Sequence, residues 1–307
     1  LGDSKFLVAE ADESDGTFLL LFPTIAVATN IDLEHLDFYK DINEIKAAFL
    51  AFLNKVPFYG VNILCIDNAN IQSLIPLLKR RYMTYGLSKQ ADLRADNISY
   101  QGFVTKFRVI YKGYDLGEIE LNLAGAHNVV NALAACGVAI ELDIPFYTIQ
   151  EALKNFSGIH RRLEIKYDGD IKLIDDYGHH PTEIKATLNA MRKMWKGRII
   201  VAFQPHRYTR TRGLMEEFAT SFNEADILIV TEIYAASEDP IEGISGSALA
   251  EKIRASGHKN VLFAPTRDDV IEKIVHNAQP GDVVITLGAG DLYRIDEKLK
   301  STWTGKK

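Results

Sequence analysis

Apolar and polar positions alternate along this chain in two rhythms, one that favours strands and one that favours helices. In the first part, short apolar runs followed by polar residues predict buried, parallel strands at 6–11, 24–31 and 61–67. Apolar residues recur at helical spacing from Asp41 to Val56, just before Pro57, and predict an amphipathic helix. Another helix is expected at 71–79. From 93 to 123 the period changes to two, which predicts an antiparallel patch.

The second part of the chain alternates strand and helix patterns more regularly. Helical patterns at 128–142 and 149–156 end at Ser157-Gly158, and we place a boundary there between domains 1–157 and 158–307. After a hairpin signal at Asp168-Gly169-Asp170, further apolar runs alternate with helical patterns, at 198–203, 226–231, 260–264 and 282–287. The expected fold is α/β: a first domain with a mixed sheet, then a doubly wound, Rossmann-like domain of about five parallel strands.

The composition is typical of a two-domain globular chain and argues against some partners. Of 307 residues, 47% are hydrophobic and 25% are charged, which is enough for two buried cores. The net charge of -6 argues against a general affinity for nucleic acid or anionic membranes. Cys65 and Cys136 fall in apolar patterns and are expected to be buried and reduced, as in a cytoplasmic protein. No apolar run reaches membrane-spanning length, so no membrane insertion is expected.

The polar stretch 175–182 follows an apolar run and precedes a helical pattern, so it is predicted to be a strand-to-helix turn. Pro181 or Thr182 can open the helix. The stretch carries two carboxylates, a phenol and two imidazoles at the carboxyl end of a predicted parallel strand, where open α/β sheets bind ligands. The alternative is an ordinary polar connector whose side chains cap the helix.

A basic stretch, 204–212, follows the strand predicted at 198–203 and is expected at the same sheet edge as 175–182. It interleaves Arg207, Arg210 and Arg212 with His and Tyr, and guanidinium groups hold a small carboxylate through paired hydrogen bonds. The alternative is a solvated basic surface.

Two further stretches contrast in what they indicate. His160-Arg161-Arg162 lies just past the predicted boundary and is expected to bring a guanidinium over phosphate as the domains close. Gly288-Ala289-Gly290-Asp291 ends the last predicted strand, but position 293 is Tyr where a dinucleotide fingerprint needs glycine. We interpret it as a structural turn.

Acidic stretches follow the first two predicted strands. Two adjacent parallel strands would deliver Glu10 and His35 to one sheet edge, and hard oxygen ligands with one imidazole suit Mg²⁺ or Mn²⁺. The alternative is a solvated loop edge, which is our interpretation of the other acids there, namely Glu13, Asp15, Asp32, Glu34 and Asp37.

An Ala-rich helical pattern begins with Gly125-Ala126-His127-Asn128. Asn128 and Asn131 are one helical turn apart and therefore share a face. Their amides can match both the donor and the acceptor edges of an adenine. Alternatively, Asn128 is simply a helix cap.

Taken together, these motifs resemble the Mur ligase family along nearly all of the chain. The stretches that carry the resemblance are Glu10 to Asp15, Thr29-Asn30-Ile31 with His35, Gly125 to Asn128 with Asn131, His160-Arg161-Arg162, Asp176 to Thr182 and Gln204 to Arg210. The paired stretches at Asp176 and Gln204 are specific to the alanine-adding member.

The resemblance implies an enzyme that couples ATP cleavage to amide formation in peptidoglycan precursor synthesis. UDP-N-acetylmuramate would be activated as an acyl phosphate, and the amine of L-alanine would then attack it. Mg²⁺ or Mn²⁺ and arginine would offset the repulsion between the two anionic substrates.

The resemblance also assigns roles to single residues. Glu10 and His35 would hold the metal ions; Asn128, Asn131, Arg162 and Asp176 would bind ATP; and Tyr177, His179, His206, Arg207 and Arg210 would bind alanine. Arg162 would meet the phosphates and Asp176 the ribose. The expected catalytic residues are Arg162 and His179, the latter as acceptor of the amine's proton, with water as the alternative acceptor.

The sequence departs from the family pattern because it contains no Gly-x-x-x-x-Gly-Lys-Ser/Thr loop. In full-length members that loop, and a UDP-binding domain before it, precede the strand that ends at Glu10. We therefore expect a central ATPase-type domain without its first strands, followed by a whole C-terminal domain. Residues 1–307 alone are expected to be inactive, because the β- and γ-phosphates lack that cradle.

The same motifs allow other interpretations of the function, and each predicts a different sequence feature. A non-catalytic nucleotide-binding module would keep the cleft and lose the phosphate loop. A murein-peptide recycling ligase or a folylpolyglutamate synthetase would share the architecture but differ around Gln204 to Arg210. A nicotinamide dehydrogenase is disfavoured by the incomplete glycine fingerprint.

Overall fold

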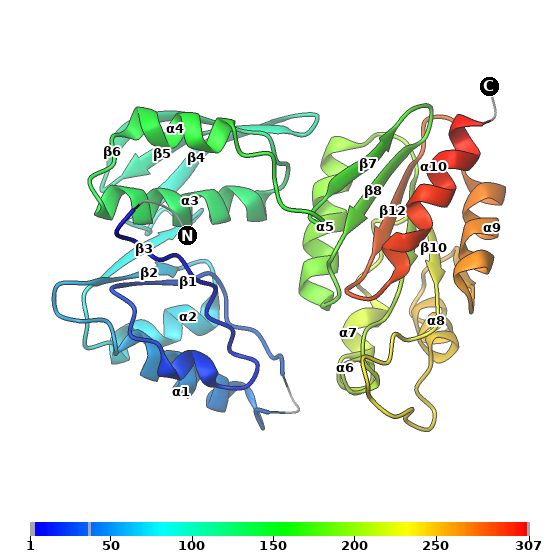
Figure 1. Cartoon of the computed structure of the whole chain (residues 1–307), viewed down its shortest axis with the longest axis horizontal. Coiled ribbons are helices and arrows are strands. Elements are labelled where there is room, and N and C mark those ends of the chain that lie inside the picture. Colours follow the sequence, from blue (N-terminus) through cyan, green and yellow to red (C-terminus); the bar gives the residue numbers. More distant parts are fainter. Residues whose placement is uncertain (1–3, 36–37, 306–307) are drawn as a thin grey trace. The chain divides into compact units, whose positions relative to one another are not determined.

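The computed structural model describes residues 4–35 and 38–305, which form two compact units (Figure 1). The main division of the chain lies between Lys154 and Asn155, and two short earlier stretches, 100–105 and 121–127, belong to the second unit by their contacts. The domain boundary at Ser157-Gly158 stays a prediction. Asp37, considered above as part of an acidic loop edge, lies outside the described residues.

The first sheet is mixed. Its strands, in spatial as well as chain order, are β1 (Ile25–Ala28), β2 (Val61–Cys65), β3 (Tyr82–Gly86), β4 (Leu93–Gln101), β5 (Val104–Tyr111) and β6 (Tyr114–Leu121). Strands β1 to β4 run parallel. The last three are joined by connections of only two residues, which are long enough for antiparallel hairpins but not for parallel crossovers. The antiparallel patch predicted between 93 and 123 is therefore present.

The helices of the first unit match the predicted periodic segments. They are α1 (Ile42–Leu53), α2 (Ala69–Leu74), α3 (Ala126–Glu141) and α4 (Phe146–Lys154), with 3-10 turns η1 (Thr17–Leu20) and η2 (Ile75–Leu77). Helix α1 begins where Asp41 accepts hydrogen bonds from the backbone N–H groups of Asn43 and Glu44. The α-helix predicted at 71–79 is shorter, because Pro76 cannot donate a backbone hydrogen bond and the chain tightens into η2.

One strand prediction in this unit is wrong, and one strand was missed. Residues 6–11 form no strand, and the side chains of Phe6, Leu7 and Val8 are 53%, 88% and 93% exposed. Strand β1 pairs only with β2 among the described residues, so the apolar run 6–11 has no sheet neighbour that would bury it. Strand β3 was not predicted, although it pairs with both β2 and β4.

The second sheet has the predicted doubly wound character. It contains β7 (Glu164–Asp168), β8 (Lys172–Asp176), β9 (Ile199–Phe203), β10 (Ile227–Val230), β11 (Val261–Phe263) and β12 (Val283–Leu287), in the order β11-β10-β9-β12-β8-β7. Strands β8 to β12 are parallel, whereas β7 pairs antiparallel with β8 at one edge. The hairpin predicted at Asp168-Gly169-Asp170 connects β7 and β8.

Alternate residues of these strands feed two separate cores, one on each face of the sheet. One face packs against α5 (Pro181–Met194), α7 (Met215–Ala219) and α8 (Gly246–Ala255). The other packs against α9 (Arg267–Asn277), the 3-10 turn η3 (Leu292–Ile295) and α10 (Asp296–Thr304), so the sheet is covered on both sides (Figure 1).

The register of this sheet brings three strand ends to one level. Leu287 at the end of β12 is paired with Asp176 of β8 on one side and with Phe203 of β9 on the other. The segments that follow these residues therefore leave the sheet at the same edge. Just beyond, Gly288 has a φ of 140°, and a Cβ there would lie 2.6 Å from the carbonyl oxygen of Gln204, so this turn requires glycine.

Cys65 and Cys136 are both buried free thiols, as the apolar pattern around them predicts. Among the described residues, none of the helices combines the length and the apolar character that crossing a bilayer demands.

Candidate functional site

The turn between β8 and α5 is organised around the buried carboxylate of Asp176. Its oxygens accept hydrogen bonds from the backbone N–H groups of Leu163 and Gly178, both at 2.9 Å, and from the hydroxyl of Thr187 at 3.2 Å. Burial raises the pKa of Asp176, and these donors oppose the rise. In this structure Asp176 holds the turn in shape; its contact with a ribose stays a prediction.

Helix α5 begins with a capping box. His180 is the N-cap, and its ring nitrogen accepts from the N–H of Thr182 at 3.3 Å, while Glu183 accepts from the N–H groups of His179 at 2.9 Å and of His180 at 3.1 Å. Burial would raise the pKa of Glu183, but the charge of His179 and these backbone donors lower it overall. Glu183 was not among the predicted site residues, although its position three residues after the cap is a visible capping signal.

The imidazole of His179 has a defined orientation in this turn. Its Nδ1 lies 3.1 Å from the carbonyl oxygen of Tyr177 and 3.6 Å from Oε2 of Glu183. Because a carbonyl oxygen only accepts, Nδ1 carries a hydrogen and the lone pair of the neutral ring lies on Nε2. The ring of Tyr177 packs edge-on against His179 with centroids 5.3 Å apart.

His206 follows β9 and faces His179, with ring centroids 5.9 Å apart. His206 also stacks on Tyr234, with ring centroids 5.5 Å apart, and a bridge pairs the backbones of these two residues. Nη1 of Arg210 lies 3.2 Å from its Nδ1; a guanidinium only donates, so Nδ1 accepts and the neutral ring carries its hydrogen on Nε2. Burial, with the charges of Arg210, His179 and Arg207, lowers the pKa of His206 to about 4.

Arg207 stands at the start of α6 (Tyr208–Gly213) in an unusual backbone conformation. Its φ is 70°, and its N–H donates to the carbonyl oxygen of Tyr234 at 2.9 Å. Thr209 is fixed by Glu238, which accepts from its N–H at 3.0 Å and its hydroxyl at 2.6 Å. Tyr234 and Glu238 were missed because they lie in an irregular segment after β10 with no recognisable pattern.

Arg162 is half-exposed and pairs with Glu183, Nη1 to Oε1 at 3.4 Å. Its guanidinium also lies 5.7 Å from the ring centroid of Tyr177. The structure thus gathers, at the carboxyl edge of the second sheet, the predicted site residues Arg162, Tyr177, His179, His206, Arg207 and Arg210.

In the first unit, the structure groups His35 with Glu13 and Glu34 and not with Glu10, its predicted partner in metal binding. Glu13, Glu34 and His35 present ligand atoms that all lie within 4.8 Å of one another, and His35 Nε2 is 3.5 Å from Glu13 Oε1. Glu10 is exposed and does not belong to this group. Two carboxylates and one imidazole are a donor set that fits Mg²⁺ or Mn²⁺. Metal binding by Glu10 stays a prediction.

Asn128 and Asn131 lie one turn apart near the start of α3, as predicted. Asn131 is exposed and Asn128 is partly buried. Their contact with adenine stays a prediction.

Comparison with known proteins identifies the class to which this fold and site belong. The Mur ligase middle domain matches residues 2–139, and the Mur ligase glutamate ligase domain matches residues 161–290. The chain therefore belongs to the Mur ligase family, and its sheets are the mixed α/β architecture of that family.

Within the family, the chain is similar to particular ligases. The UDP-N-acetylmuramate–L-alanine ligases of Geotalea uraniireducens and Geotalea daltonii are 56% and 54% identical to it, over 97% of this chain and 66% of their own length. The crystal structure of UDP-N-acetylmuramate-alanine ligase MurC from Thermotoga maritima aligns with a TM-score of 0.78 and 25% identity, covering 97% of this chain and 63% of that one. The chain thus spans just under two thirds of the length of these relatives.

Proposed function

We propose that this chain forms part of an enzyme that joins L-alanine to UDP-N-acetylmuramate at the expense of ATP, in the cytoplasm, during peptidoglycan precursor synthesis. The observation that carries the proposal is the identity of more than half with ligases of that name over 97% of the chain. The grouping of His179, His206, Arg207 and Arg210 at one sheet edge supports it, because small zwitterions need both cationic and proton-accepting partners.

In this proposal the carboxylate of alanine is held by the basic side of the cluster. Arg207 and Arg210 supply guanidinium donors, and neutral His206 offers its Nε2 hydrogen as a further donor. Stacking on Tyr234 fixes the plane of the His206 ring. A neutral imidazole beside two arginines adds a hydrogen bond without adding charge repulsion.

The amine of alanine must lose a proton before or as it attacks, and His179 is the proposed acceptor. The contact of its Nδ1 with the Tyr177 carbonyl leaves the lone pair on Nε2, and the nearby Glu183 carboxylate stabilises the imidazolium that forms. In this arrangement Glu183 orients His179, and His179 acts as the general base.

ATP and Mg²⁺ or Mn²⁺ are the proposed cofactors. When bound, the metal offsets the charge of the phosphates. Glu13, Glu34 and His35 would hold it, with Glu10 as a further ligand; Arg162 would meet the phosphates, Asp176 the ribose, and Asn128 with Asn131 the adenine. Arg162 is exposed enough to exchange its contact with Glu183 for a phosphate.

The alanine assignment is tested in the full-length product of the gene that encodes this chain, by measuring ADP release with UDP-N-acetylmuramate. A lysine cannot replace a paired guanidinium contact, so Arg207→Lys or Arg210→Lys should raise the KM for alanine about 10-fold or more and leave the KM for ATP nearly unchanged. Arg212→Lys, on an exposed position of α6, is the matched control and should change neither.

Equal effects on both KM values would assign these arginines to phosphate instead. Ligation of a murein peptide but not of alanine would favour the recycling reaction.

A further inference from the structure

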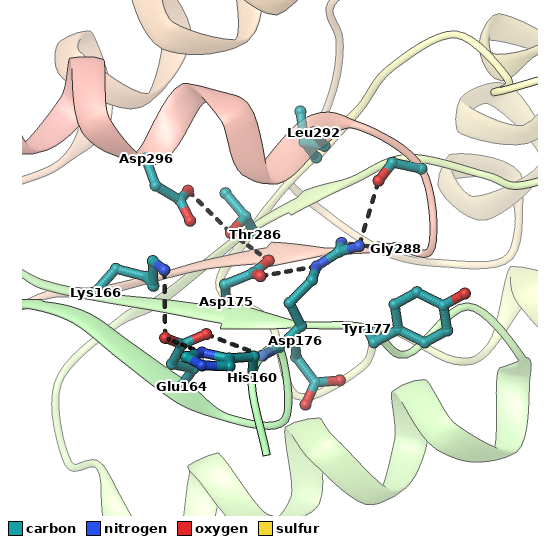
Figure 2. Close-up of polar contacts among 12 residues, drawn as sticks. His160, Glu164, Lys166, Asp175, Asp176, Tyr177, Thr286, Gly288, Leu292 and Asp296 are labelled. Atoms are coloured by element: carbon teal, nitrogen blue, oxygen red, sulfur yellow. Dashed lines mark hydrogen bonds and ion pairs between the residues drawn. The ribbon is translucent and has the colours of Figure 1, made fainter. Parts of the chain in front are cut away.

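A row of buried polar side chains connects β8, β12 and α10 in the second unit. The hydroxyl of Thr286 on β12 lies 3.1 Å from Oδ1 of Asp175 on β8 and 3.1 Å from Oδ1 of Asp296, the first residue of α10. All three residues are buried. Figure 2 shows Thr286 between the two carboxyl groups. Two acids thus share one hydroxyl in a place that water does not reach.

The number of hydrogens limits how this group can be protonated. The Thr286 hydroxyl has one hydrogen, lies 3.1 Å from an oxygen of each acid and 3.4 Å from the carbonyl oxygen of Ile174, and can donate to only one of these acceptors. We infer that one of the acids donates to it. Nε of Arg161 lies 3.0 Å from Oδ2 of Asp175, which favours the charged form there. Oδ2 of Asp296 is buried with no hydrogen-bond partner in the described part of the chain, which disfavours charge. The proton therefore belongs on Asp296.

The charged groups around Asp296 agree with this assignment. Burial and the charge of Asp175 raise the pKa of Asp296 to about 7, while the contact with Thr286 and the charges of Lys166 on β7 and of Arg161 oppose the rise. Burial also raises the pKa of Asp175, but the guanidinium of Arg161 opposes that rise directly. Of the two coupled acids, Asp175 is the one held charged.

Arg161 connects Asp175 to the turn that follows β12. Its Nη2 donates to the carbonyl oxygen of Gly288 at 2.5 Å, and its Nη1 approaches that of Gly290 at 3.4 Å. Its guanidinium lies over the rings of both Tyr177 and Tyr293, 5.0 Å and 4.5 Å from their centroids. Its own carbonyl accepts from the N–H of Tyr177 at 2.6 Å. Arg161 therefore ties the turn after β12 to the turn that carries Tyr177.

We propose that Arg161 is a positioning residue for Tyr177 and, through it, His179, and that it is held by a hydrogen-bonded chain in which protonated Asp296 donates to Thr286 and Thr286 donates to charged Asp175. The positioning part rests on the proposed function. The protonation part concerns the folded chain alone.

The protonation part is tested by thermal unfolding of residues 1–307 between pH 5 and 8. In Asp296→Asn the amide donates to Thr286 as the protonated acid does, without losing a proton at high pH. We expect its Tm to exceed that of the unsubstituted chain at pH 8 and the difference to shrink toward pH 5. Glu297→Gln, on the exposed side of the same helix, should track the unsubstituted chain. An Asp296→Asn variant that is less stable at pH 8 would overturn the assignment.

The positioning part is tested in the full-length enzyme by separating KM values. Thr286→Val removes the bridging hydroxyl and should raise the KM for alanine several-fold without changing that for ATP, whereas Thr286→Ser keeps the hydroxyl and should restore the ordinary value. Arg161→Lys should act like Thr286→Val, because an ammonium cannot stack on the two rings as a planar guanidinium does while it bonds two carbonyls. Equal alanine KM values in the Val and Ser variants would overturn positioning. Absence of ligation by the unsubstituted enzyme would overturn the proposed function and leave the unfolding result standing.

Discussion

Single residues at this site owe their chemistry to the hydrogen-bond partners beside them. His179 and His206 are the same residue type 5.9 Å apart, yet one contacts a carbonyl and the other a guanidinium through Nδ1. The first contact leaves a lone pair on Nε2 and the second leaves a hydrogen there. Two imidazoles thus offer opposite functions to one small substrate.

The low pKa of His206 makes the stability of the chain sensitive to acid. The folded form has a pKa of about 4, below the ordinary value of 6.5. Between these values the unfolded chain binds more protons, so stability falls as the pH drops from 6.5 toward 4 and is retained above 6.5.

We expect this loss to be about 1 to 2 kcal/mol, after a discount because His206 is only partly buried. His206→Gln should remove that part of the pH dependence, whereas His160→Gln, at an exposed position, should keep it. Urea unfolding at pH 4.5, 5.5 and 6.5 measures the difference. An unchanged pH dependence in His206→Gln would contradict the assignment.

Helix α5 shows how one element couples stability to the site. Glu183 closes its capping box and also lies beside His179 and Arg162. Removing that carboxylate would leave the backbone N–H groups of His179 and His180 without their acceptor, and the imidazole of His179 would lose a contact that orients it.

Glu183→Ala is therefore expected to cost about 1 to 2 kcal/mol in the free energy of unfolding and to raise the KM for alanine. Asp269 closes the corresponding box of α9 away from this cluster, so Asp269→Ala should lower stability without changing KM. Urea unfolding and steady-state kinetics separate the two effects. A shared change in KM would mean that the kinetic effect is only loss of stability.

The elements of the second unit could be predicted from the sequence because its buried parallel strands are mostly apolar; β9 and β10, for example, contain no polar residue. The run at 6–11 looks the same in sequence but is unpaired, since apolarity does not say whether a neighbouring strand exists. Strand β3 was missed because Thr84, which bonds Asp92 at 2.8 Å, leaves at most two consecutive apolar residues in it. Contacts made by irregular segments, such as those of Tyr234, carry no periodic signal.

At the scale of the whole molecule, the first unit leaves apolar side chains exposed, whereas the second has two buried cores. The second sheet has a core on each face and ends in the edge strands β11 and β7. In the first unit Phe6, Leu7 and Val8 are exposed, and the edge strand β1 exposes Val27. Exposed apolar edges lower independent stability and favour association.

Residues 158–307 are therefore expected to fold alone, with one cooperative urea transition, whereas residues 1–157 alone should be less stable. Circular dichroism and amide proton dispersion of the two separate fragments measure this. A second fragment without a cooperative transition would contradict the expectation.

The backbone of Arg207 has a consequence for how this site tolerates change. Its φ of 70° is a conformation that glycine adopts readily and that other residues adopt at a cost. A glycine there would relax the chain and delete the guanidinium together. At position 207, the residue that favours stability therefore differs from the residue that favours substrate binding. A screen for thermostable variants would select against the arginine that is proposed to hold the substrate.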